Sequence, residues 1–527
     1  MELKKSENCV FLDQKADKKT GKNKLPFRFI FSITIVFIKC VLIVGLGVLL
    51  LIVFPPFRWV EFMFRIVLAV KIIVSADNPD YKLPWLLFLL ILPVAGVTLY
   101  FLFYSKSLNI KYVKNLNYLN GKSYRKSDEK EFIELKKQDA FAYSQAKLLT
   151  QISNCNLFFS GDITYLNSGE KTFDEMLCDL SNAKKFIFLQ YFIIKSGTLW
   201  QKIKSLLIKK SMSGVEVKLL FDDVGCMKSA STLGVSDLVN HGVQVATFSK
   251  INAFSGREFN NRNHRKITVI DGEVAYLGGV NVADEYINAV NRFGHWKDCG
   301  VRIKGSAVKE ITKLFLTDYY LSTRKIDEFI DNRYPTLVAK ESAENGFCIP
   351  FGDGPRPTYP YSVTKTAILN LIGYATNYLY ITTPYLVMDD ELCLALESAS
   401  LKNVDVRIIL PSIPDKRIVF EVSKSYYPRL IQKGVKIYEY KKGFVHSKIY
   451  LADRKCAIVG SANLDYRSLV HHFEVGAWLY GAACLKDIEN DLTNLMESCE
   501  LVNGKRLNQN SFTKGLISVV KIFSPLL

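Results

Sequence analysis

One 18-residue pattern occurs twice in the sequence, and this repeat constrains the fold more than any other feature. The first copy runs from His264 to Asn281 and the second from His446 to Asn463, and both read H-x-K-(x)4-D-(x)6-G-[GS]-x-N. The chain has only six histidines, and two of them begin these copies. Chance recurrence has odds below about 1 in 1,000. The repeat therefore predicts two copies of one fold in one chain.

The segments that precede each copy share one order of elements. Residues 185–194 and 214–222 are short apolar runs rich in strand formers, and so are residues 377–385 and 404–411. Each pair predicts a buried strand, a crossover helix and a parallel strand. Each repeated pattern then predicts a β-hairpin with apolar arms. We expect an α/β fold.

The repeated pattern brings together groups that bind an anion. Histidine and lysine two residues apart share one face of a strand, because side chains alternate along it. Two such faces would surround one oxyanion with two imidazoles, two ammonium groups and neutral donors, which suits a phosphodiester. The candidate residues are His264, Lys266, Asn281, His446, Lys448, Ser461 and Asn463. Neither copy supplies a carboxylate cluster or a metal-spaced His/Cys set, so we expect no metal and no cofactor.

The aspartates of the pattern, Asp271 and Asp453, belong to the same candidate catalytic motif as these histidines and lysines. Each stands at the expected turn of its hairpin, where a short carboxylate can bond to nearby backbone amides. We therefore assign both to structure rather than to chemistry.

The N-terminal fifth of the chain is apolar enough to enter a membrane. Residues 29–54 contain one charge, Lys39, and residues 83–104 contain none. Since about 20 apolar residues cross a bilayer, we expect both segments to span it. Residues 57–74 are apolar but contain Arg58, Glu61, Arg65 and Lys71, and an interfacial helix and a third span both remain open for them.

Basic segments flank this membrane region on both sides. We expect a basic tail at residues 1–26, a transmembrane region at 27–104 and a basic linker at 105–149. Because positive flanks stay in the cytoplasm, both ends should be cytoplasmic, which favours two spans and a multi-pass protein of the cell membrane. A cleaved signal peptide is the alternative for the first segment, but no small-x-small site follows it.

The formal net charge of +18 favours an anionic partner, either nucleic acid or lipid headgroups. Composition leaves both open, and the membrane segments favour lipid. Eleven cysteines without CxxC spacing predict neither a disulfide framework nor a zinc site, so the bulk of the chain is expected in a reducing cytosol.

The duplicated pattern resembles the HKD motif of the phospholipase D superfamily, and the chain from about residue 83 onward resembles the bacterial cardiolipin synthases. The flanking sequences that carry the resemblance are Asp284-Glu285-Tyr286, Trp296-Lys297-Asp298, the run from Asn463 to Ser468, and Phe473-Glu474. The sequence departs from the family at Gly279, where the second copy has Ser461, and at His472, where asparagine is expected.

This resemblance implies two tandem phospholipase D-like domains, at residues 150–335 and 336–527, that share one active site. The family transfers a phosphatidyl group from one phosphatidylglycerol to another and releases glycerol. Phosphatidylglycerol and other anionic phospholipids of the membrane are the implied partners, nucleic acid is not, and the oligomeric state stays open.

The resemblance also implies roles for individual residues. His264 would form the phosphohistidine, and His446 would protonate the leaving alcohol and deprotonate the incoming one. Asp298 and Glu474 would orient the imidazoles, although surface carboxylates at strand ends are the alternative for these two. The residues expected to stabilise the phosphate oxygens are Lys266, Lys448, Asn281, Asn463 and Ser461.

Two other functions remain open at the level of the sequence. A phosphodiesterase or a phosphatidyltransferase with a different alcohol acceptor would use the same histidines and lysines. A non-catalytic membrane scaffold is the alternative from another class, but it would not require two complete His/Lys/Asn sets.

Overall fold

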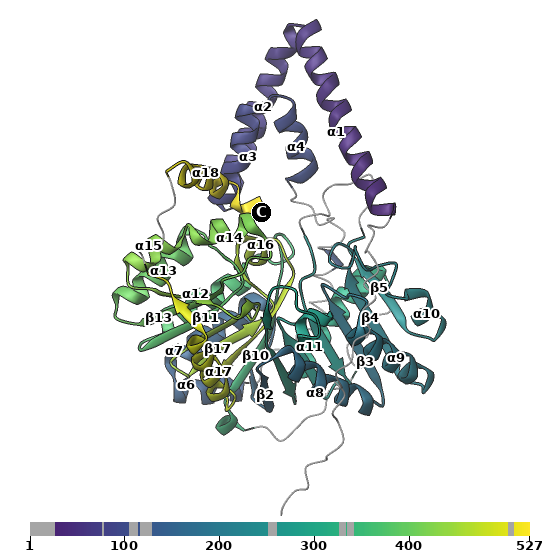
Figure 1. Ribbon diagram of the computed structural model, residues 1–527, viewed down its shortest axis with the longest axis vertical. Coiled ribbons are helices and arrows are strands. Elements are labelled where there is room, and N and C mark those ends of the chain that lie inside the picture. Colours follow the sequence, from purple (N-terminus) through teal and green to yellow (C-terminus); the bar gives the residue numbers. More distant parts are fainter. Residues whose placement is uncertain are drawn as a thin grey trace, which may run out of the picture.

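A computed structural model describes residues 27–75, 78–104, 114–115, 129–250, 261–325, 334, 342–503 and 511–526. Two β-sheets with helices packed around them form the body of the molecule, and the N-terminal helices project from it (Figure 1). The expected α/β class is confirmed.

The first sheet has seven strands and is built from the first half of the repeat. Its strands, in spatial order, are β2 (Asp162–Leu166), β9 (Gly300–Lys304), β7 (Val274–Gly278), β6 (Ile267–Ile270), β3 (Phe186–Tyr191), β4 (Glu216–Asp222) and β5 (Gln244–Phe248). Its helices are α8 (Gly169–Asn182), α9 (Thr198–Met212), α10 (Val235–Asn240) and α11 (Val308–Thr323).

The second sheet has nine strands. In spatial order they are β1 (Phe158–Phe159), β10 (Phe347–Asp353), β19 (Glu474–Tyr480), β17 (Cys456–Gly460), β16 (Ile449–Ala452), β11 (Tyr378–Thr382), β13 (Asp405–Pro411), β14 (Lys436–Tyr440) and β20 (Cys499–Leu501). Its helices are α12 (Val363–Tyr374), α13 (Asp390–Leu401), α14 (Arg417–Lys424), α15 (Tyr427–Gln432), α16 (Tyr466–Val470) and α17 (Leu485–Glu497).

Without its two edge strands, the second sheet repeats the strand order of the first. Strands β3 and β4 are parallel with α9 between them, and β11 and β13 are parallel with α13 between them, as the apolar runs predict. The repeated pattern forms the antiparallel hairpins β6–β7 and β16–β17. The sequence repeat is therefore a structural repeat.

The two domains share a hydrophobic core. One face of the first sheet packs with α11 against elements of the second domain in a single buried cluster that includes Phe188, Phe315 and Phe347. The other face is covered by α8, α9 and α10 in a second cluster that includes Trp200. Burial of this continuous apolar surface fixes the two sheets relative to each other.

The segment at residues 105–149 is not simply a linker where the structure describes it. Helices α6 (Glu129–Gln138) and α7 (Ala140–Ser153) pack on the second domain, and their apolar residues Leu135, Ala146 and Leu149 belong to the shared core. An apolar helix face buried on a neighbouring sheet explains this packing.

The N-terminal region contains α1 (Phe27–Val53), α2 (Pro56–Val74), α3 (Pro79–Ile91) and α4 (Ala95–Phe103). Among the helices that the structure describes, one is long and apolar enough to cross a membrane, over Ile30–Val53. The segment at 83–104 is not one helix: it breaks at Leu92–Val94, around Pro93, so that α3 and α4 have 13 and 9 residues. Its two ends lie side by side, with 5.6 Å between the ring centroids of Tyr81 and Tyr104, so α3 and α4 form a hairpin and the predicted span over residues 83–104 is wrong.

Two charged residues of α2, Glu61 and Arg65, form hydrogen bonds with the backbone at this helix break. The backbone N–H of Val94 donates to Oε1 of Glu61 at 3.1 Å, and Arg65 donates to the carbonyl of Leu89 at 3.0 Å. Arg65 also pairs with Glu61. A helix break leaves backbone groups without partners, and in an apolar region such groups need internal ones. The ion pair in the ambiguous segment therefore stabilises the break in the next segment.

Helix α18 (Ser511–Ile522) returns to the membrane region. It contacts α14 and α3, and the ring of Phe523, just beyond α18, lies 5.2 Å from that of Phe88. Leu516 and Val519 remain exposed. The C-terminal segment is thus packed on its own chain at the side that faces the N-terminal helices (Figure 1).

Candidate active site

The two halves of the repeat meet through their backbones at the repeated motifs. Short parallel pairing joins β8 (His295–Lys297) to β15 (Gly443–Val445), and Asn263 forms a parallel bridge with Phe473. Beyond these pairings, the N–H of His446 donates to the carbonyl of Lys297 at 2.7 Å. The N–H of His264 donates to the carbonyl of Phe473 at 2.8 Å. Each histidine is thus fixed beside a segment of the opposite half.

Each imidazole pairs with a carboxylate from the opposite half. Nδ1 of His264 lies 3.0 Å from both carboxylate oxygens of Glu474, and Nδ1 of His446 lies 2.6 Å from Oδ2 of Asp298. These contacts follow from the backbone pairing, because Glu474 and Asp298 come directly after Phe473 and Lys297. All four side chains are buried. The alternative of surface carboxylates is wrong for Asp298 and Glu474.

The two lysines are buried between these pairs and each bonds back to its own motif. Nζ of Lys266 donates to the carbonyl of His264 at 2.6 Å, and Nζ of Lys448 donates to the carbonyl of His446. Strands β6 and β16 begin one residue after each lysine, at Ile267 and Ile449. Each lysine lies near the histidine of its own motif, as predicted. The loop before the strand holds the two residues, rather than the strand itself.

Burial shifts the protonation of these groups. Desolvation, helped by the neighbouring lysines and opposed by the carboxylates, lowers the pKa of His264 and of His446 to about 4. Burial also lowers the pKa of Lys266 to about 7 and that of Lys448 to about 8. For Glu474, burial alone would raise the pKa, but the attraction of His264 and the hydrogen bonds it receives hold that pKa well below the usual value. Both imidazoles are therefore neutral at neutral pH before an anion binds.

The predicted amide donors have other bonds as well. Nδ2 of Asn281 donates to the hydroxyl of Tyr286 at 2.7 Å, and Nδ2 of Asn463 donates to Asp465 at 3.0 Å. Since an amide nitrogen carries two hydrogens, each amide keeps one hydrogen beyond these bonds, and phosphate binding by it stays a prediction. Ser461 differs from its prediction, because its hydroxyl donates to Glu474 and accepts from the N–H of Val475. Its hydroxyl supports Glu474 rather than facing the anion site.

Gly279, one of the two departures from the family pattern, makes room for the carboxylate of Asp298. A Cβ at this position would lie 2.2 Å from Oδ1 of Asp298 and 3.1 Å from the carbonyl of His446. No side chain fits there while Asp298 keeps its place. The first half therefore combines glycine with aspartate where the second combines Ser461 with Glu474.

The motif aspartates do not reach the imidazoles. Asp271 accepts the backbone N–H groups of Lys184, Lys185 and Phe186, at 2.7 to 2.8 Å. Asp453 accepts those of residues 376, 377 and 378 in the same way. Each aspartate ties its hairpin turn to the start of the neighbouring strand, in agreement with a structural role. In the part of the chain that the structure describes, neither aspartate bonds to an imidazole, so the motif contributes them to the fold and not to the reaction.

Two residues at the site were not singled out from the sequence as site residues. Arg265, inside the first motif, is fully buried and donates to the carbonyl of Glu474 and to Asp318, at 3.0 and 2.9 Å. His472 lies beside His264, with the ring centroids 5.5 Å apart. The departure from the expected asparagine marked His472, but only the fold shows that it joins His264 and Glu474 in a group of possible metal ligands.

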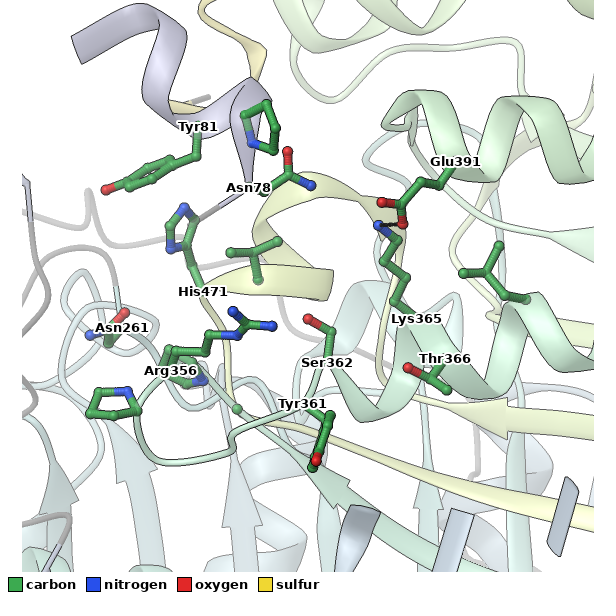
Figure 2. A pocket seen from close by; sticks show the side chains of 16 residues that line it. Asn78, Tyr81, Asn261, Arg356, Tyr361, Ser362, Lys365, Thr366, Glu391 and His471 are labelled. Atoms are coloured by element: carbon green, nitrogen blue, oxygen red, sulfur yellow. Dashed lines mark ion pairs between the residues drawn. The ribbon is translucent and has the colours of Figure 1, made fainter. Parts of the chain in front are cut away.

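A large cavity lies beside this site rather than in it. It has a volume of about 600 Å³ and is enclosed by α3, α12 and the loop at 354–357. Figure 2 shows Arg356 and His471 facing it, and Lys365 paired with Glu391 at its other side. His471 is next to His472 in the chain, so one short segment separates the cavity from the first imidazole.

The remaining histidines lie away from the imidazole pairs. His241 is partly exposed and bonds to Asp237, and Nδ1 of His295 lies 3.0 Å from the hydroxyl of Tyr440.

Comparison with known proteins places this geometry in a family. The family model described as "Cardiolipin synthase, PLD-like domain" matches residues 176–318 and 368–496, and the one described as "Phospholipase_D-nuclease N-terminal" matches residues 64–103. The two segments of the first match each contain one copy of the repeated motif.

Relatives match over most of their length. A protein of Streptococcus mutans labelled as uncharacterized is 38% identical over 84% of this chain and 96% of its own. The cardiolipin synthase of Alkalihalophilus pseudofirmus is 33% identical over 88% of this chain and 92% of its own. The solved phosphatidylserine synthase of Haemophilus influenzae shares the fold, with a TM-score of 0.56 at 16% identity over 72% of this chain and 98% of its own. The repeat, the cross-half site and these matches show that the chain belongs to the cardiolipin synthase family of phospholipase D-like proteins.

Proposed function

We propose that this protein is a membrane-bound cardiolipin synthase that transfers a phosphatidyl group from one phosphatidylglycerol to another. The observation that carries the proposal is the pair of buried imidazoles, each bonded through Nδ1 to a carboxylate of the other half. A neutral imidazole with Nδ1–H bonded to a carboxylate has its lone pair on Nε2, as a nucleophile or a base requires.

In the first step, Nε2 of His264 attacks the phosphorus and the bond to the headgroup oxygen breaks. His446, protonated once the anionic substrate is bound, gives its proton to that oxygen, and glycerol leaves. In the second step, His446 takes the proton from the hydroxyl of another phosphatidylglycerol, whose oxygen attacks the phosphorus. The bond from phosphorus to nitrogen breaks, cardiolipin leaves, and His264 is restored.

The cationic and amide groups act on the charge that develops at phosphorus. Lys266 and Lys448 stabilise the equatorial oxygens, and Asn281 and Asn463 donate their remaining hydrogens to them. Burial of the site limits the water that competes with the second lipid for the phosphohistidine. The cavity between α3 and the second domain supports delivery of a headgroup from the membrane side (Figure 2).

The function is tested by incubating detergent-solubilised protein separately with labelled phosphatidylglycerol, phosphatidylethanolamine and single-stranded DNA. We expect cardiolipin and glycerol from phosphatidylglycerol, no product from DNA, and unchanged activity in the control variant His241→Ala. Phosphatidic acid as the main lipid product would instead establish a phosphodiesterase. No product from any substrate would favour a scaffold.

Membrane topology is part of the proposal. We infer two crossings, with the N-terminal tail and both catalytic domains in the cytoplasm, from the lysine-rich flanks of the apolar region. The hairpin of α3 and α4 returns to the side of the catalytic domains, so we assign the two crossings to α1 and α2, and Glu61 and Arg65 support the turn between α3 and α4.

An impermeant maleimide applied to intact cells tests this topology in single-cysteine variants of a cysteine-free background. Phe54→Cys, in the connection between α1 and α2, should react. The native Cys9, Ser107→Cys and Ser75→Cys should react only after the cells are opened, and the hydroxyl of Ser75 lies 3.4 Å from that of Tyr104. Labelling at positions 9, 75 or 107 but not at 54 would refute the two-span arrangement.

A further inference from the structure

His472 completes a group of three metal-ligand side chains around the first imidazole–carboxylate pair. Nδ1 of His472 lies 3.8 Å from Oε1 of Glu474, and Nδ1 of His264 lies 3.0 Å from the same oxygen. One ligand atom from each of the three residues lies within 4.8 Å of the other two. The pair described above therefore has a third potential ligand that the reaction does not use.

We propose that His264, His472 and Glu474 bind one divalent cation of the zinc type, and that this cation inhibits the enzyme. Tetrahedral zinc holds nitrogen and oxygen ligands at about 2.0–2.2 Å, which separates neighbouring ligand atoms by about 3.3–3.5 Å. The two distances to Oε1 of Glu474 bracket this value. Two histidines and one glutamate are also a ligand set that zinc takes in proteins. A small shift of the His472 ring would bring its Nδ1 from 3.8 Å to this separation from Oε1 of Glu474.

The state of His472 supports a ligand role. Nδ1 of His472 is buried and has no hydrogen-bond partner among the residues that the structure describes. Its side chain is only 12% exposed, so solvent replaces little of that missing bond. A buried nitrogen without a partner costs free energy, and a cation that accepts its lone pair removes this cost. Imidazole ligands select Zn²⁺ or Co²⁺ over Mg²⁺ and Ca²⁺, which prefer oxygen.

The surrounding charges set the strength of binding. Glu474 attracts a cation, whereas Lys266 and Arg467 face the same histidines and repel it. We expect a reversible site, weaker than a structural zinc site.

Inhibition follows from the tautomer of His264 and rests on the proposed function. With Nδ1–H bonded to Glu474, the lone pair of His264 is on Nε2. A cation on Nδ1 requires that nitrogen to be unprotonated, and the proton of the neutral ring then occupies Nε2. Nε2 can no longer attack phosphorus, and Glu474 is withdrawn from orienting the ring. The cation therefore competes with catalysis rather than assisting it.

Binding is tested without lipid substrate, by titrating Co²⁺ and Zn²⁺ into the full chain in neutral detergent after treatment with EDTA. We expect one equivalent of Co²⁺ with a tetrahedral d–d absorption spectrum, displaced by Zn²⁺. The affinity should fall at least about 10–100-fold in His472→Asn, the range for residues that only support a metal ligand. The control His241→Asn removes a histidine that also pairs with a carboxylate, and it should bind as the native chain does. Absence of a saturable spectrum, or equal binding by His472→Asn, would overturn the site.

Inhibition is tested separately with phosphatidylglycerol in mixed micelles. EDTA-treated enzyme should be fully active, Zn²⁺ should lower the rate, and excess EDTA should restore it. The inhibitory concentration for His472→Asn, relative to its own uninhibited rate, should rise at least about 10–100-fold. Activation by Zn²⁺, or equal inhibition of both proteins, would overturn the inhibitory role. Since the Co²⁺ spectrum needs no turnover, failure of the proposed function leaves the binding result intact.

Discussion

The two imidazole–carboxylate pairs have the same construction but different surroundings. In both, a histidine of one half bonds to a carboxylate of the other, and its backbone is fixed to the residue before that carboxylate. His446 packs against the rings of Tyr286, Trp296 and Phe444, with a single 2.6 Å contact to its carboxylate. His264 has its carboxylate at 3.0 Å through both oxygens, and His472 beside it.

This difference shows how a duplicated fold supports two roles at one phosphorus. The repeat supplies two equivalent histidines and lysines, and the pKa of both imidazoles is lowered to about 4 by burial. The free protein therefore does not separate nucleophile from acid by charge state. What differs is the support of each carboxylate: Glu474 accepts a bond from Ser461, while Asp298 occupies the space that Gly279 leaves open.

The largest effect is expected from removing either imidazole. His264→Ala and His446→Ala should each lower turnover by about 10⁴-fold or more, because each removes a group that forms or breaks bonds at phosphorus. Labelled phosphatidyl should be trapped on His446→Ala but not on His264→Ala. The reverse trapping pattern would exchange the two roles, and unchanged membrane insertion and circular dichroism serve as the control.

Neutralising the carboxylates should cost about 10²–10⁴-fold in kcat, since each fixes the tautomer of its imidazole. Asp298→Asn should slow the proton transfers that His446 carries out. Glu474→Gln should slow the attack of His264 on phosphorus. Rapid-quench measurement of glycerol release and cardiolipin formation separates them: Glu474→Gln should slow formation of the phosphohistidine. Equal effects of both variants on every step would show that the surroundings of the two pairs do not matter.

Exchanging the supporting residues tests the comparison directly. Gly279→Ser should lower kcat about 10–100-fold, because its Cβ would lie 2.2 Å from Oδ1 of Asp298 and displace that carboxylate. Ser461→Gly should cost about 3–10-fold, since Glu474 keeps its bonds to His264 but loses one hydroxyl. A larger loss for Ser461→Gly than for Gly279→Ser would contradict this account.

The smallest effect is expected from pH. The turnover number kcat, which reports the substrate complex in which His446 is protonated, should rise as pH increases above about 4, because the nucleophile His264 has a pKa of about 4 in the free protein and must be neutral. It should decline above pH 7 to 8, because Lys266 and Lys448, with pKa values of about 7 and about 8, lose the charge that stabilises the phosphate. A rate that stays constant to pH 10 would show that both lysines remain charged there.

Local pattern was enough to predict the repeat, the parallel strand pairs, the hairpins and the structural place of Asp271 and Asp453. These features depend on neighbours within a few residues or on a period of two along a strand. The prediction of a continuous span over residues 83–104 was wrong, since a run without charges does not reveal that the chain turns back around Pro93 and forms α3 and α4.

The sequence by itself determined the fold class, the family and the two histidine–lysine sets, because all of them are written in contiguous, repeated residues. Only the tertiary structure decided that His264 pairs with Glu474 and His446 with Asp298, across 210 and 148 residues of chain. It also decided that Ser461 supports a carboxylate and that His472 joins the first pair. Such contacts depend on how two sheets pack through a shared apolar core, and sequence spacing carries no information about that distance.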